Sequence, residues 1–81
     1  MGHNMSTIHV VTLEPKTGKG RNKINEAGKP EHWIVQDQRE SVGFSERDGP
    51  WLLIQPANNA GDKSRWVNLV NDNDFVVTVV R

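Results

Sequence analysis

Short runs of apolar residues, several alternating with polar ones at the period of two typical of β-strands, recur along most of this chain. Valine, isoleucine, threonine and aromatic residues are concentrated in these runs, and glycine, proline, asparagine and aspartate separate them. The predicted strands are residues 7–13, 33–35, 41–45, 51–54, 66–70 and 75–80. Short strands with turn residues between them are typical of a small barrel or sandwich.

Turn residues predict how the last four strands are connected. Asp48 and Gly49 tolerate the positive φ of a type I′ hairpin turn. Residues 71–74, Asn-Asp-Asn-Asp, predict a tight turn in which side chains hydrogen-bond the backbone. The strands from residue 41 onward are therefore expected to form one antiparallel meander. Because barrel closure removes most exposed edges, we predict an all-β fold: a small antiparallel barrel or meander of five to six strands, SH3-like or OB-like.

A long connection separates the first two predicted strands. Within it only residues 22–27 have a helical signal of about one turn, with Gly28 in the C′ position and Pro30 after it. We therefore predict a long basic loop between strands one and two. Long ordered loops in compact domains often have a function.

The length of 81 residues and the absence of cysteine limit what this chain can be. One domain with a thin core is expected, here residues 7–81, with residues 1–6 as a flexible N-terminus in which Met5 offers a second start. Without cysteine, neither disulfides nor thiolate metal sites stabilise the fold, which favours a reducing, cytoplasmic location. No apolar run approaches the roughly 20 residues that cross a bilayer, and no signal peptide is visible.

Charge is unevenly distributed along the chain, whose formal net charge is zero. Residues 14–30 contain five basic and two acidic residues, net +3, whereas residues 31–81 are net −3. Gly18 and Gly20 in the basic segment allow close approach of a ligand, and basic side chains suit phosphate. We therefore predict nucleic-acid binding there, with a merely solvated charged loop as the alternative. The predicted contacts are Lys16, Lys19, Arg21 and Lys23.

Tryptophan can also contribute to nucleic-acid binding, because an exposed indole ring can stack on bases. Trp33 follows the basic segment and is included in the predicted site. The alternative for each of the three tryptophans is core packing, since a small barrel needs large apolar side chains to fill it. Phe44 and Phe75 occupy alternating positions and are expected in the core.

The last predicted strand, residues 75–80, is apolar on both faces, whereas a half-exposed strand alternates. An uncovered strand of this kind promotes aggregation. We therefore predict that it lies at a homo-oligomer interface or a partner-binding edge, with a central strand shielded by the long loop as the alternative. The predicted partner-binding residues are Phe75, Val77 and Val79.

Signals for metal binding and catalysis are weak. The three histidines lack the spacing and the cysteine partners of a zinc site, and residues 72–74 lack the glycine and glutamate of an EF-hand loop. No nucleophile elbow or Ser-His-Asp order is visible. A small hydrolase would need His32 paired with Glu31 or Glu40 in a pocket. We expect no metal, no cofactor and no enzymatic activity.

Two classes of function follow from these patterns. The first is a non-enzymatic β-barrel module that binds nucleic acid through the basic segment. The second is a protein-interaction or assembly module that acts through the C-terminal strand, as small accessory proteins of phages and mobile elements do. Changing Lys19 and Arg21 to glutamate distinguishes them, because only the first depends on these charges.

Overall fold

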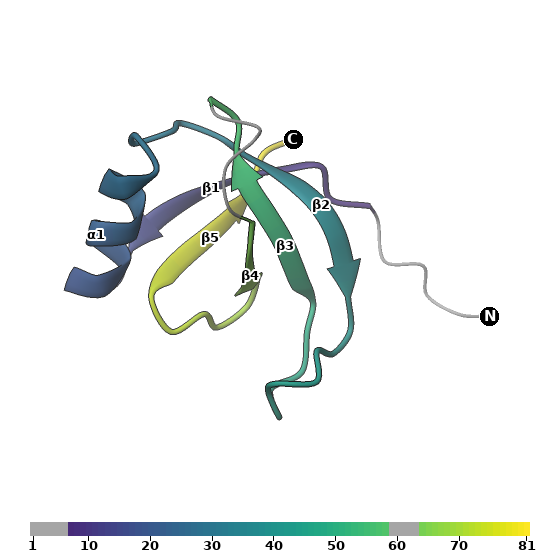
Figure 1. The fold of residues 1–81 in the computed structure, drawn as a ribbon. Helices are drawn as coiled ribbons and strands as arrows, with labels where there is room; N and C mark the ends of the chain where they lie inside the picture. The colour runs from purple at the N-terminus through teal and green to yellow at the C-terminus, as the bar shows by residue number, and fades with distance from the viewer. Residues whose placement is uncertain (1–6, 59–63) are drawn as a thin grey trace.

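The computed structural model describes residues 7–58 and 64–81, and Figure 1 shows their arrangement. The N-terminal residues 1–6, expected to be flexible, lie outside the described part of the chain. The described residues form β1 (Val10–Pro15), α1 (Gly18–Glu26), β2 (Trp33–Arg39), β3 (Trp51–Pro56), β4 (Arg65–Asn68) and β5 (Phe75–Val79).

The five strands make one antiparallel sheet in the order β4-β3-β2-β1-β5. The sheet curls strongly, so that its edge strands β4 and β5 approach each other (Figure 1). The prediction of an all-β, small antiparallel barrel of five to six strands is confirmed. The observed form is a curled half-barrel of five strands with one short helix.

Strand β5 does not continue the meander of β2, β3 and β4, and this part of the prediction is wrong. It pairs with β1 instead, from Phe75 opposite Pro15 to Val79 opposite Val11. This pairing removes β1 from the edge of the sheet. It also places Phe75 and Val77 in the core.

Residues 41–45 do not form the predicted strand. They belong to the connection between β2 and β3, in which Val42 is buried and Phe44 is 67% exposed. The expectation that Phe44 lies in the core is therefore wrong. Its ring packs edge to face against Trp51, with the ring centroids 5.7 Å apart. Apolar alternation over so few residues does not distinguish a strand from a loop that folds over a neighbouring side chain.

The predicted type I′ turn at Asp48 and Gly49 is also wrong, because neither residue has a positive φ. Gly49 is needed for a different reason. A Cβ at this position would lie 2.6 Å from the carbonyl oxygens of both Arg39 and Glu40. The glycine thus allows the connection to pass close to the end of β2.

Helix α1 occupies much of the segment predicted as a basic loop. The Thr17 hydroxyl caps its first turn by accepting a hydrogen bond from the Gly20 N–H at 3.0 Å. Gly28, with φ of 87°, occupies the predicted C′ position. The N–H groups of Gly28 and Lys29 bond to the carbonyls of Asn25 and Ile24. The helix has nine residues rather than about one turn, because Gly18 and Gly20 weaken its sequence signal.

The core lies inside the curled sheet. Helix α1 packs Ile24 and Ala27 against it and so covers one end of the half-barrel. The core includes Phe75, as predicted, at 4% exposure. The fully or nearly buried core residues are Val11, Trp33, Leu52, Ile54, Val67, Phe75 and Val77.

The turn between β4 and β5 has the side-chain-to-backbone bonding predicted for residues 71–74. The Asp72 carboxylate accepts hydrogen bonds from the N–H groups of Asn68, Asp74 and Phe75, at 2.8, 3.0 and 3.2 Å. The buried Asn68 side chain accepts from the N–H groups of Val70 and Asn71 and donates to the carbonyl of Asp48. Side-chain hydrogen bonds from Asn68 and Asp72 therefore hold the turn together.

Candidate functional site

The first residues of the basic segment attach α1 to the turn before β5. Lys16 Nζ donates to the carbonyl oxygen of Asp72 at 2.7 Å, and Thr17 Oγ1 donates to Asp74 Oδ1 at 3.0 Å. The Lys16 N–H also donates to the Asp74 carbonyl at 2.7 Å. Lys16 is therefore engaged in the fold, and the negative charge of the turn opposes the binding of a phosphate at this point.

Helical geometry separates the other basic side chains of the predicted site. Lys19 and Lys23 are four residues apart and lie on the same side of α1, whereas Arg21 lies about 160° around the helix from each of them. Lys19 and Arg21 are exposed and Lys23 is half-buried. The side chains of the four predicted residues do not converge on one point, and those of Lys19, Arg21 and Lys23 make no hydrogen bond or ion pair with the described residues.

Gly20 faces the turn before β5 and not a ligand. A Cβ on Gly20 would lie 2.3 Å from the Asp74 carbonyl oxygen, whereas a Cβ on Gly18 would meet open space. The prediction that Gly20 admits a ligand is wrong. Glycine is required there because α1 packs directly on the backbone of the turn.

The tryptophans do not form the predicted platform beside the basic segment. Trp33 is 2% exposed and lies in the core, so its ring is unavailable for stacking. Trp51 is 6% exposed and its indole N–H donates to the Arg47 carbonyl at 2.9 Å. Trp66 is half-buried beneath the Arg39 guanidinium, which lies 5.7 Å from the centroid of its rings. The burial of Trp33 fits the core-packing alternative.

Strand β5 alternates in burial although its sequence does not alternate in polarity. Phe75 and Val77 are buried, and Val79 is half-buried against the core. Val76, 47% exposed, and Thr78 face outward. The predicted partner-binding side chains Phe75, Val77 and Val79 thus point inward, because pairing with β1 turns this face toward the core. These side chains pack in or against the core.

The side of β5 away from β1 has no hydrogen-bonded strand in the described part of the chain, although β4 approaches β5 without pairing with it. The Val80 N–H donates to the Val10 carbonyl, and the Asp74 carbonyl accepts from Lys16, so even-numbered residues bond toward β1. Because hydrogen-bonding direction alternates along a strand, the N–H and C=O groups of Val77 and Val79 point to the free side. We call this free side the β5 edge.

An apolar groove lies at the end of the half-barrel away from α1, next to the last residues of β5. It has a volume of about 490 Å³. Segments far apart in the sequence form it, and half-buried Ile8, Leu69 and Val79 provide its apolar wall. No sequence signal links these segments. The groove, called here the mouth groove, is lined by Thr7, Ile8, His9, Leu69, Val79, Val80 and Arg81.

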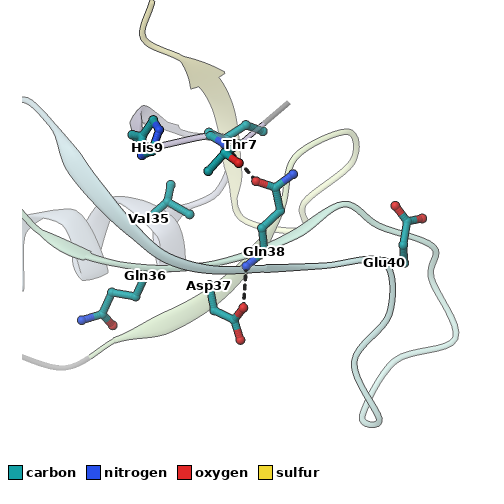
Figure 2. Close-up of a pocket in the computed structure, with 8 residues that line it drawn as sticks. Thr7, His9, Val35, Gln36, Asp37, Gln38 and Glu40 are labelled. Atoms are coloured by element: carbon teal, nitrogen blue, oxygen red, sulfur yellow. Dashed lines mark hydrogen bonds between the residues drawn. The ribbon is translucent and has the colours of Figure 1, made fainter. Parts of the chain in front are cut away.

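A second depression, of about 470 Å³, lies between the residues before β1 and the second half of β2 (Figure 2). Gln38 Oε1 accepts from the Ile8 N–H at 2.9 Å, and Asp37 Oδ1 accepts from the Gln38 N–H at 2.8 Å. These side chains supply bonds where the register of β2 shifts between Val35 and Asp37. Because these polar groups already bond to one another, the depression is less suited to a ligand than the mouth groove.

The structure places His32 and Glu31 at one depression and Glu40 at another. His32 and Glu31 are exposed beside Ala57 and Asn58, whereas Glu40 lies at the depression that contains His9 (Figure 2). Among residues 7–58 and 64–81, no group of three or more histidine and acidic side chains is placed to hold a metal ion.

Searches against protein-family models, curated proteins and solved structures find no match to this chain. No helix in the described residues has both the length and the apolar character needed to cross a membrane. The surface features available for a function are the β5 edge, the mouth groove and α1.

Proposed function

We propose that this domain is a non-enzymatic binding module that pairs with an extended segment of a partner protein along the β5 edge. The observation that carries the proposal is the outward backbone of Val77 and Val79, which bonds to no other strand among the described residues and lies beside an apolar groove. In strand addition, backbone hydrogen bonds provide affinity and pockets for alternate side chains provide specificity. The edge supplies the first and the mouth groove supplies the second.

The composition of β5 supports this proposal. Natural proteins protect exposed edge strands with charges, proline, bulges or short length. The opposite edge strand, β4, begins with Arg65, but β5 consists of Phe-Val-Val-Thr-Val and has no charge, proline or bulge. An unprotected edge strand promotes aggregation when it is exposed, and it can pair with a partner strand that covers it.

The alternative function is nucleic-acid binding through α1. It is favoured by one observation, the exposed cationic groups of Lys19 and Arg21, which form no ion pair with the described residues. Their opposite orientations on the helix, the engagement of Lys16 with the turn and the burial of Trp33 all count against it. We therefore place strand binding first.

The test is a titration of ¹⁵N-labelled protein with a short capped peptide of alternating threonine and valine. We expect amide shift changes at residues 76–81 and around the mouth groove. The same peptide with every amide N-methylated cannot pair and should cause no change. Changes elsewhere, or equal changes with both peptides, would refute strand addition.

Three variants extend this titration. Val79→Pro removes an outward N–H without removing a bond to β1, and should abolish peptide binding while the circular dichroism spectrum is retained. Val70→Ser removes an exposed valine that is outside β5 and does not line the mouth groove, and it should bind normally. Lys19→Glu with Arg21→Glu should also bind peptide normally. Salt-sensitive binding of single-stranded DNA that this double change abolishes would favour the alternative function.

A further inference from the structure

We propose that a second copy of this chain occupies the β5 edge when no other partner is present, through antiparallel pairing of β5 with β5. The inference rests on the proposed function, because it assigns an occupant to the same edge. It also goes further, since it makes the free protein a concentration-dependent dimer whose interface must open before another strand can bind.

The pattern of free backbone groups limits the pairing to registers in which odd-numbered residues face odd-numbered residues, and full overlap of the two strands selects one of them. Groups that point to the free side belong to odd-numbered residues, so a two-fold axis at Val77 places each of them opposite another. Phe75 then faces Val79 of the second copy, and Val77 faces Val77. This register is the one that overlaps all five residues of β5. A two-fold interface of this kind is self-complementary and closes with two subunits.

The hydrogen bonds of this pairing can be counted. The Phe75 N–H is already donated to Asp72 Oδ2 at 3.2 Å, so it does not contribute. The N–H groups of Val77 and Val79 in each copy remain, which gives on the order of four bonds across the interface. Every donor in β5 that points outward is thus either bonded within the chain or satisfied by the second copy.

Charge and exposure also fit a second copy. Strand β5 has no charged residue, so no like charges oppose each other in the pairing. Beyond its end, Arg81 of one copy comes level with Asn73 of the other, between two aspartates of the turn. On the outer face, exposed Val76 lies opposite Thr78 of the second copy, which reduces the exposure of the valine side chain to solvent. The complementarity occurs twice by symmetry.

The interface is small, because it consists mainly of two five-residue strands. Stable interfaces bury about 1,200–2,000 Å², so we expect a weak dimer that dissociates on dilution. A weak self-interface is what a module needs if a partner strand is to displace the second copy.

The experiment compares two double variants that differ only at residue 78, which is lysine in one and glutamate in the other. In the proposed register, residue 76 of one copy faces residue 78 of the other. Val76→Lys with Thr78→Lys places lysine opposite lysine twice, whereas Val76→Lys with Thr78→Glu places lysine opposite glutamate twice. Both positions are exposed on the outer face, so neither variant disturbs the core. The V76K/T78K variant should sediment as a monomer and the V76K/T78E variant as a dimer.

Sedimentation over micromolar to millimolar concentrations is the measurement. Wild-type protein should shift toward twice the monomer mass as concentration rises, and amide exchange at Val77 and Val79 should slow in parallel. A wild-type monomer at all concentrations, or equal dimerisation of both variants, overturns the inference. If a wild-type monomer still binds the threonine-valine peptide, the inference fails and the proposed function stands. If the wild type dimerises through β5 but the monomeric V76K/T78K variant does not bind the peptide, the proposed function fails instead.

Discussion

Alanine substitutions at Gly20 and Gly18, two residues apart in α1, are expected to change stability in opposite directions. Both substitutions improve helix propensity, by up to about 1 kcal/mol each. They differ in what the new methyl group meets. At residue 18 it meets open space, and at residue 20 it lies 2.3 Å from the Asp74 carbonyl oxygen.

The magnitude for Gly20→Ala follows from that contact. A normal carbon–oxygen separation requires α1 and the turn to move apart by about 1 Å. The movement weakens the bonds from the Lys16 N–H and the Thr17 hydroxyl to Asp74, each worth about 1 kcal/mol. Overpacking in tight contacts typically costs about 1–3 kcal/mol. We expect a net loss in that range, which lowers Tm by roughly 4–20 °C in a domain of this size.

Urea denaturation followed by tryptophan fluorescence measures both variants against wild type. Gly18→Ala should raise the free energy of unfolding by less than about 1 kcal/mol, because its only effect is on the helix itself. If Gly20→Ala were as stable as Gly18→Ala, close packing of α1 on the turn would be refuted. If Gly20→Ala kept full stability but lost DNA binding, Gly20 would have the ligand role that its sequence context indicates.

Three further outcomes are expected. Asp72→Asn leaves one amide oxygen as the acceptor for three N–H donors, so it should lower the free energy of unfolding in urea by roughly 1–3 kcal/mol. An unchanged urea midpoint would contradict the role of this turn. Phe75→Ala should lower the free energy of unfolding by about 3–5 kcal/mol because its ring is buried. Phe44→Ala should lower it by less than about 1.5 kcal/mol because it loses mainly one aromatic contact. Similar losses for the two variants would contradict their different exposures. Lys19→Glu with Arg21→Glu should change thermal stability by less than about 0.5 kcal/mol, and a larger effect would mean that these side chains hold the fold.

Local features of the fold were predictable from the sequence. Four of the six predicted strands overlap β1, β3, β4 and β5, and the second marks the start of β2. The helix stop at Gly28 and the aspartate-rich turn after β4 also appear as expected. Each depends on neighbouring residues alone: alternation, a left-handed glycine, or a side chain that bonds its own backbone.

Features that depend on distant residues were not predictable. Residues 41–45 alternate like a strand, but Phe44 covers Trp51 from a loop. Gly20 looks suited to a ligand, yet it is required by the Asp74 carbonyl, 54 positions later in the chain. The basic residues look clustered along the chain, but helical geometry points Arg21 away from Lys19.

The candidate site divides in the same way. The sequence alone determined that the final strand is uncharged and apolar enough to need cover. Only the tertiary structure decided that this strand lies at the edge of the sheet, that Phe75 and Val77 face inward, and that the backbone of Val77 and Val79 faces outward. The reason is that strand order and groove walls are set by which distant segments pair, and composition within one strand carries no information about its neighbours.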